Sequence, residues 1–196
     1  MGMTFLANLQ SIAGKSPRQY PAKEVGFEPK DRPQAVDFAE ALELGAFHDV
    51  HARLTEISDG GVVDWDRFDI ADFVPYITSI ATFERIETPD GEIDFIYKVA
   101  GENINRVAKR NLRGCTLREV LIGPNRDVIL TEYMQTLAER RPSASRGSVD
   151  ISDLTWVHYL RFLYPVRRHG EVGYLLNFML FASSTGGEAE FAKPAI

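Results

Sequence analysis

Apolar and polar residues alternate along several segments of this chain, as they do in half-buried β-strands. Residues 93–100 alternate in this way, and the turn at 89–92 joins them to an earlier strand-like segment at 81–88. Further along, the same alternation predicts three more strands, of which the last two are joined by a turn at 168–171. These three strands are expected at 145–152, 156–167 and 172–181.

Between the second and third of these strands the apolar spacing is helical. A helix is predicted over 101–110, and a second one is expected to start at Thr116, which forms a capping box with Glu119. A longer helix follows Pro124, with Asn125 as its cap. Its predicted apolar face consists of Leu130, Tyr133, Met134 and Leu137. Hairpins at both ends with helices between them predict an α+β fold, with an antiparallel sheet and its helices on one face.

The first part of the chain, residues 1–61, is predicted to be an arm followed by a flanking helix from Pro33 to Ser58. This helix would carry an apolar stripe at 3, 4, 3 spacing, which has to be buried. Either the chain's own sheet or the same helix of a second copy would cover it. The stripe consists of Phe47, Val50, Leu54 and Ile57.

Composition and charge exclude several classes of protein. Hydrophobic residues make up 44% and charged residues 26% of the 196 residues, which is typical of a globular domain. The formal net charge of -6 disfavours nucleic acid as a partner. No segment reaches the ~18 apolar residues of a membrane span, and Cys115 has no second cysteine to pair with, so a reducing cytoplasm fits best.

The order of elements, together with residues at their joints, resembles a PAS domain, in particular the bacterial family of short, mostly single-domain PAS proteins with a helical N-terminal extension. The resemblance covers about residues 62–181. It rests on Trp65, on 95–101 before the helix of Ile104, on 111–114 before Thr116-Leu117, on Tyr164-Pro165-Val166 and on Gly170.

This resemblance implies a five-stranded antiparallel sheet that encloses a small cavity under the central helices, in a sensor domain over 62–182 followed by a flexible tail at 183–196. It also implies sensing or docking of signalling proteins rather than catalysis, with histidine kinases or cyclic-dinucleotide enzymes as the kind of partner. PAS domains often dimerise through a flanking helix. We therefore expect a cytoplasmic homodimer whose interface includes the stripe of Phe47, Val50, Leu54 and Ile57.

Known PAS cofactors fit the sequence poorly. A haem-binding PAS domain needs an axial ligand, commonly His, on the long helix, and residues 127–141 contain none. Flavin photochemistry needs a cysteine inside the following helix, whereas Cys115 directly follows Gly114. His48 and His51 lie three residues apart but lack further ligands, so no metal site is predicted. Cys115 is either a redox-sensitive thiol beside Arg113 and Arg118 or a half-buried small residue.

Candidate ligand-binding residues are the polar side chains that interrupt apolar sheet faces. Along 156–167 one face carries His158, Leu160, Phe162 and Tyr164, and the other carries Tyr159, Arg161 and Leu163; we expect the first to be the inner face. The pocket is then empty, filled by side chains, or occupied by a small apolar ligand. The candidate residues are Tyr97, Tyr133, His158 and Asn177.

Two classes of function remain open. The first is a non-enzymatic sensor or interaction module. The second is a small α+β cone enzyme of the isomerase or hydratase type, which uses one Asp or His inside an apolar cavity. Asp94 and Asp150 are the acidic residues within strand faces, and their alternation predicts that both point outward. The sequence therefore favours the module.

Overall fold

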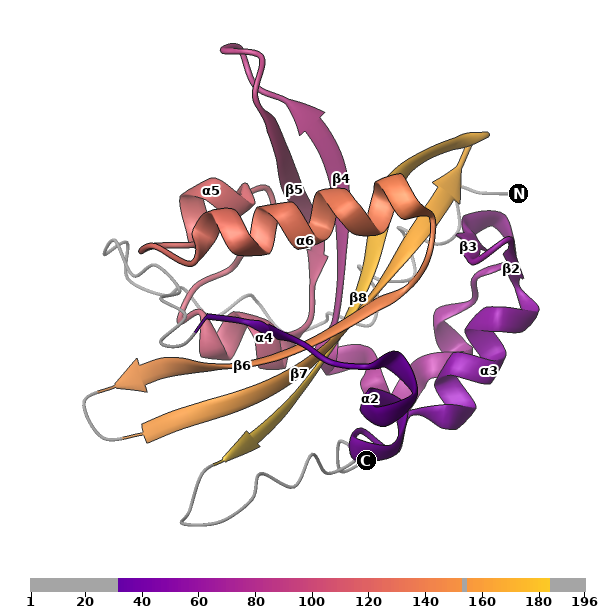
Figure 1. Cartoon of the computed structure of the whole chain (residues 1–196), viewed down its shortest axis with the longest axis horizontal. Coiled ribbons are helices and arrows are strands. Elements are labelled where there is room, and N and C mark those ends of the chain that lie inside the picture. Colours follow the sequence, from indigo (N-terminus) through magenta and orange to yellow (C-terminus); the bar gives the residue numbers. More distant parts are fainter. Residues whose placement is uncertain (1–31, 153–154, 184–196) are drawn as a thin grey trace.

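The computed structural model describes residues 32–152 and 155–183. The predicted arm before residue 32 and the predicted tail beyond residue 183 lie outside the described residues. In the described part, the chain is an α+β protein in which helices cover both faces of one large, mainly antiparallel sheet (Figure 1). The predicted α+β class is thus confirmed.

Among the described residues the sheet has eight strands. Six of them follow the order β1-β6-β7-β8-β4-β5, while β3 pairs in parallel with β7 and β2 pairs with β3. Five of the strands are long and three are short. The short strands are β1 (Gln34–Ala35), β2 (Ser58–Asp59) and β3 (Val62–Asp64). The long strands are β4 (Ile80–Glu87), β5 (Ile93–Ala100), β6 (Ser143–Ser152), β7 (Thr155–Arg168) and β8 (Glu171–Ser183).

Both predicted hairpins are confirmed. The β4–β5 turn is closed by Thr88 N–H, which donates to the carbonyl of Glu92, and Gly91 supplies the positive φ of 79°. In the β7–β8 turn, His169 and Gly170 have φ of 51° and 83°, as a tight hairpin that follows the twist of its strands requires.

Several helices connect or cover these strands, two of them 3₁₀ segments. Before β4 come α2 (Phe38–Leu44), α3 (His48–Glu56), η1 (Trp65–Arg67) and η2 (Ile70–Ser79). Between β5 and β6 come α4 (Glu102–Val107), α5 (Leu117–Val120) and α6 (Arg126–Glu139). None of the described helices combines the length and the apolar character needed to cross a bilayer.

The helices α4, α5 and α6 bury one face of the sheet. Thr116 and Glu119 form the predicted capping box at the start of α5. Along α6, Leu130, Tyr133 and Leu137 are buried as predicted, but Met134 is 39% exposed. Asn125 is the N-cap residue of α6, as predicted, although its side chain makes no capping hydrogen bond.

The opposite face is buried by α2, α3 and η2. The predicted single helix from Pro33 to Ser58 is wrong, because the chain breaks into α2 and α3 at Gly45 and Ala46, where Ala46 has a φ of 46°. At Gly45 the backbone lies so close to the sheet that a Cβ would come within 3.0 Å of Leu180 and 3.1 Å of Leu160. Asp37 caps α2, because its Oδ1 accepts hydrogen bonds from the backbone N–H groups of Ala39 and Glu40.

The apolar stripe of this segment is buried by the chain's own sheet. Its four residues are at most 7% exposed and belong to one core cluster with side chains of β7 and β8. The ring of Phe47, for example, stacks on that of Phe162 with centroids 4.3 Å apart. The stripe is thus covered within one chain, and both the homodimer and its interface at this stripe stay predictions. The residues are Phe47, Val50, Leu54 and Ile57.

Candidate functional site

A buried ion pair joins the middle of the sheet to α6. Arg161, on β7, and Glu132, on α6, are paired through Nη2 and Oε2, and their side chains are only 3% and 17% exposed. Arg161 faces the α4–α6 side of the sheet because it lies between Tyr159 and Leu163, which both belong to that core. The charged guanidinium of Arg161 is therefore almost completely shielded from water.

Neutral polar and aromatic groups surround the guanidinium of Arg161. Its Nε donates to Ser145 Oγ at 3.2 Å, on the neighbouring strand β6. Its central carbon lies 5.3 Å from the ring centroid of Tyr133 and 5.6 Å from that of Tyr159. Both distances are within the range of cation–π attraction. The guanidinium is thus held in place by a carboxylate, a hydroxyl and two rings.

The electrostatics keep this cluster in one protonation state. Burial lowers the pKa of Arg161, but the attraction of Glu132 outweighs it, so the pKa lies above its ordinary value. Burial raises the pKa of Tyr133 and of Tyr159, and the nearby positive charge of Arg161 opposes this only in part. At neutral pH Arg161 is therefore charged while both phenols are protonated.

Three buried polar atoms at or near this cluster have no hydrogen-bonding partner among the described residues. They are Tyr159 Oη, Asn177 Oδ1 and Glu132 Oε1. Asn177 lies on β8 opposite Leu163, which is two residues along β7 from Arg161. A buried polar atom without a partner costs about 1–3 kcal/mol. These atoms give the cluster unused capacity for hydrogen bonding to a further group.

A groove of about 610 Å³ runs beside the ion pair, between α6 and the chain segments that lead into β1 and β6. Glu132 and Thr136 line it from α6, and Ser143 lines it from β6. The hydroxyls of Thr136 and Ser143 are hydrogen-bonded to each other at 2.7 Å. The volume lies within the range of small-molecule sites.

The structure brings together three of the four predicted ligand-binding residues. Tyr97 and Tyr133 both pack against the ring of Phe83, at centroid distances of 4.3 and 5.1 Å, and Asn177 lies on the same face of the sheet. His158 does not join them, because it alternates with Tyr159 and so lies on the opposite face.

The predicted choice of inner face on β7 is therefore wrong. Leu160, Phe162 and Tyr164 pack against α2 and α3 instead of facing the central helices. Arg161 and Glu132 were not predicted as site residues. The available indication was a charged residue in the middle of an otherwise apolar strand.

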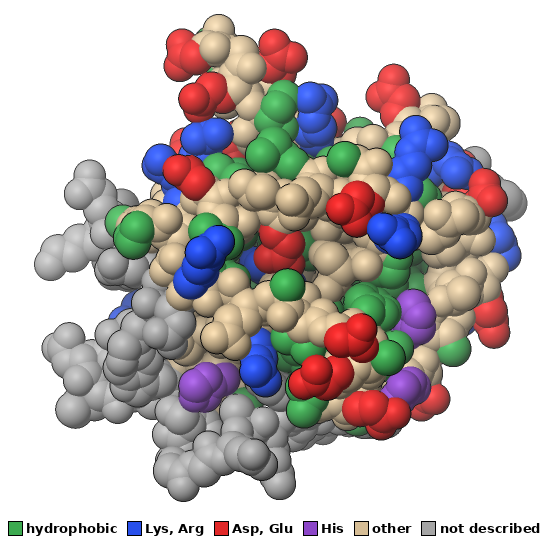
Figure 2. All heavy atoms as spheres, in the orientation of Figure 1, with side chains coloured by type: hydrophobic (Ala, Val, Ile, Leu, Met, Phe, Trp, Pro, Cys, Tyr) green, Lys and Arg blue, Asp and Glu red, His purple; other side chains and the backbone are tan. Residues whose placement is uncertain are grey.

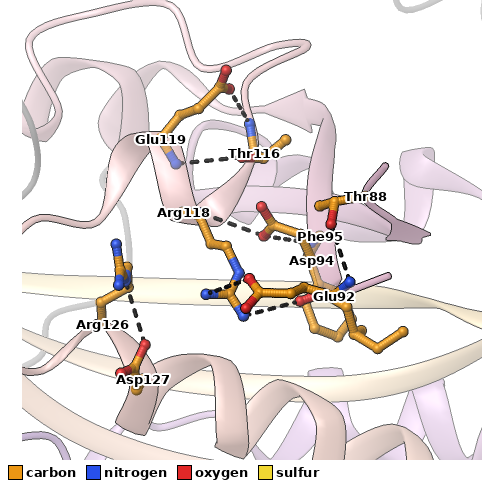
Figure 3. Close-up of polar contacts among 10 residues, drawn as sticks. Thr88, Glu92, Asp94, Phe95, Thr116, Arg118, Glu119, Arg126 and Asp127 are labelled. Atoms are coloured by element: carbon orange, nitrogen blue, oxygen red, sulfur yellow. Dashed lines mark hydrogen bonds and ion pairs between the residues drawn. The ribbon is translucent and has the colours of Figure 1, made fainter. Parts of the chain in front are cut away.

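A second polar cluster, next to the turn of the β4–β5 hairpin, ties β5 to α5 (Figure 3). Asp94 is 1% exposed, so the prediction that it points outward is wrong. Its Oδ1 accepts from the backbone N–H of Phe95 at 2.7 Å and of Arg118 at 3.4 Å. Arg118 also pairs with Glu92 at 3.2 Å. Asp94 thus has backbone partners and holds the start of α5. The side chain of Asp150 lies outside the described residues.

His48, His51 and Cys115 each contact a polar side chain of the protein itself. His51 Nδ1 and Tyr164 Oη are hydrogen-bonded at 3.1 Å, and His48 lies 3.1 Å from Glu43. Cys115 is half-buried, with its Sγ 2.8 Å from Nη2 of Arg110. Among the described residues no group of three or more His, Cys, Asp or Glu side chains is placed to hold a metal ion.

Comparisons with protein-family models, with curated proteins and with solved structures found no match for this chain.

Proposed function

We propose that this protein is a non-enzymatic sensor module of the PAS type, which binds a small ligand next to the Arg161–Glu132 pair and passes the change on to a signalling partner. The observation that carries the proposal is this pair, buried between the sheet and α6 beside polar atoms that lack partners. As predicted partners we retain histidine kinases or cyclic-dinucleotide signalling proteins, in the cytoplasm.

Energetics support a functional role for the pair. Replacing a buried ion pair by apolar side chains of similar volume is often neutral or stabilising, so stability alone gives little reason for its presence. Because Glu132 is on α6 and Arg161 is on β7, a ligand that changes their contact changes how α6 is held on the sheet. The pair therefore offers a direct connection between ligand binding and the position of a helix.

The arrangement of the long strands is compatible with the resemblance. The hairpins β4–β5 and β7–β8 are both present, and α4, α5 and α6 lie between β5 and β6 and pack on one face. The additional short strands β1, β2 and β3 extend the sheet beyond five strands. The α2 and α3 helices take the place of the predicted N-terminal extension, on the opposite face.

The described interior carboxylates favour a module over an enzyme. Asp94 accepts two backbone N–H groups, and Glu132 holds a guanidinium. A general acid or base has to exchange a proton with a substrate, and a carboxylate committed to fixed donors is poorly suited to that. We therefore propose that these carboxylates have a structural role and that the protein is not an enzyme.

Native mass spectrometry of the full chain tests the proposal. We expect a non-covalent adduct of constant mass that is absent under denaturing conditions. The double variant Arg161→Met/Glu132→Leu, which keeps the volume of the pair, is expected to lose the adduct. Arg167→Met, on the same strand but paired with Asp59 at the surface, is expected to retain it. No adduct in the unmodified chain, or turnover in a substrate screen, contradicts the proposal.

A further inference from the structure

The groove beside α6 borders one buried acceptor atom to which no described residue donates. Glu132 lines the groove; its Oε2 holds Arg161, and its Oε1 has no partner. A carboxylate has about four acceptor positions, so one carboxylate can bridge two cationic groups. Arg161 fixes the orientation of Glu132, and the second carboxylate oxygen is buried beside the groove without a donor.

The rest of the groove combines acidic side chains with apolar surface. Asp127 and Glu139 lie toward its two ends on α6, each in an exposed pair with a neighbouring arginine. Pro33, Val128 and Pro142 contribute apolar surface to the walls. Figure 2 views this side of the molecule, where acidic side chains are visible in a recess between α6 and β6.

This combination defines the chemistry of an occupant. The charge-assisted hydrogen bond from a cationic N–H to a carboxylate is roughly twice as strong as a neutral one. An alkyl chain of a few carbons would lie on the apolar walls while its cationic end reaches Glu132. Arg32 and Arg141 also line the groove, both are exposed, and they disfavour a second positive charge on the occupant.

We propose that this groove binds a small organic cation whose guanidinium or primary ammonium group donates to Oε1 of Glu132 and whose alkyl part lies between α6 and β1. The inference rests on the proposed sensor function and names the ligand class for its site. A bound cation would form an Arg161–Glu132–cation row and hold Glu132, and with it α6, more firmly against the sheet.

Titration of the full chain with pentylguanidinium, followed by backbone amide NMR, tests the ligand class. We expect saturable shifts at the amides of Thr136 and Ser143. Pentylurea has nearly the same shape but carries no charge and has a carbonyl oxygen in place of one NH2 group, and about tenfold weaker binding is expected for it. Pentanoate, which reverses the charge, is expected to cause no such shifts. Preferential binding of pentanoate, or no saturable shift with pentylguanidinium, overturns the proposal.

Variants on α6 locate the site. Gln135 is exposed and lines the groove, so Gln135→Trp is expected to fill it and abolish the shifts. Met134→Trp is the matched control, because Met134 is the adjacent exposed residue and does not line the groove. Equal loss of binding in both variants, or none in either, contradicts the proposed location. Glu132→Gln, if it folds, is expected to weaken binding at least about tenfold.

Further outcomes separate this inference from the function on which it rests. An adduct that depends on the Arg161–Glu132 pair, together with no binding of pentylguanidinium, rejects the ligand class and keeps the sensor function. Amide shifts in residues 1–31 on adding the probe would show that the chain's own N-terminal segment is displaced from the groove, which also overturns the assignment to a small ligand. Turnover in a substrate screen would reject the sensor function, whether or not the cation binds.

Discussion

Arg161 and Glu132 are 29 residues apart in the sequence, yet their side chains form a buried ion pair that fastens α6 to β7. The pair has unequal surroundings. Arg161 is enclosed by Ser145 and two tyrosine rings, whereas Glu132 borders the groove and keeps one oxygen without a donor. A change at Glu132 in the groove is therefore passed to β7 through this pair.

A double-mutant cycle on this pair is expected to show strong coupling. Arg161→Met leaves Glu132 without its cation, and Glu132→Leu leaves a buried guanidinium without its anion, so each is expected to cost about 3–5 kcal/mol of unfolding free energy. The double variant is expected to cost far less than the sum. Urea unfolding followed by circular dichroism measures all four proteins.

The surface pair Arg167–Asp59 provides the matched control for that cycle, because Asp59 is 77% exposed. Its coupling is expected to be about 0–1 kcal/mol. Single variants of Arg161 and Glu132 that stay within about 0.5 kcal/mol of the unmodified chain would show that the pair is not buried as described.

Two tyrosine-to-phenylalanine variants are expected to change the unfolding free energy differently, although each removes the same phenolic hydroxyl. Tyr159 Oη has no partner among the described residues, so Tyr159→Phe is expected to be neutral or stabilising. Tyr164 Oη is hydrogen-bonded to His51 at 3.1 Å, so Tyr164→Phe is expected to cost about 0.5–1.5 kcal/mol. Urea unfolding of both variants checks this, and a clear loss of stability in Tyr159→Phe would reveal a partner for its hydroxyl.

The long strands were predictable because alternation is a local property of the sequence. The boundaries of β5 agree with the prediction, and those of β6, β7 and β8 agree within two residues. The break between α2 and α3 was not predictable in this way. Gly45 ends α2 where the backbone meets Leu160 and Leu180, more than a hundred residues away in the sequence.

The candidate site was predictable only in part, for a similar reason. Alternation separated the two faces of β7 correctly, but helices cover both faces, so the pattern alone does not tell which face lies under α6. A charged residue in a strand is usually exposed, and Arg161 is buried because Glu132 reaches it from a helix. Asp94 is buried because backbone N–H groups of Phe95 and Arg118 satisfy it, and no side-chain pattern indicates that.

Acidification is expected to destabilise the protein through His51. Burial, and to a smaller extent the nearby His48, lowers the pKa of His51 below its ordinary value of 6.5. Below about pH 6.5, His51 of the unfolded chain therefore binds more protons than His51 of the folded chain. The contribution of the neutral His51 to folding stability is present above about pH 6.5 and is lost as the pH falls. Urea midpoints at about pH 7.5 and 5.5 measure the loss.

The variant His51→Gln is expected to reduce this pH dependence, whereas His48→Gln, on the same helix but exposed, should keep most of it. An unchanged pH dependence in His51→Gln would assign the effect to other groups.

The last prediction concerns the apolar stripe on the N-terminal side of the sheet. Leu54 is fully buried in the core cluster that includes Phe162 and Phe178. Because Leu54→Ala leaves a cavity inside the chain's own core, it is expected to cost about 2–5 kcal/mol of unfolding free energy. Leu44→Ala, which changes a leucine that is 41% exposed on α2, is the matched control and is expected to stay within about 0.5 kcal/mol.

Urea unfolding at two protein concentrations, with analytical ultracentrifugation, distinguishes burial of Leu54 in the core of one chain from burial at an interface between copies. A midpoint of the Leu54→Ala variant that does not change with protein concentration agrees with burial inside one chain. If the variant instead stays folded and only dissociates from a dimer into monomers, Leu54 lies at an interface between copies and its assignment to the core is wrong.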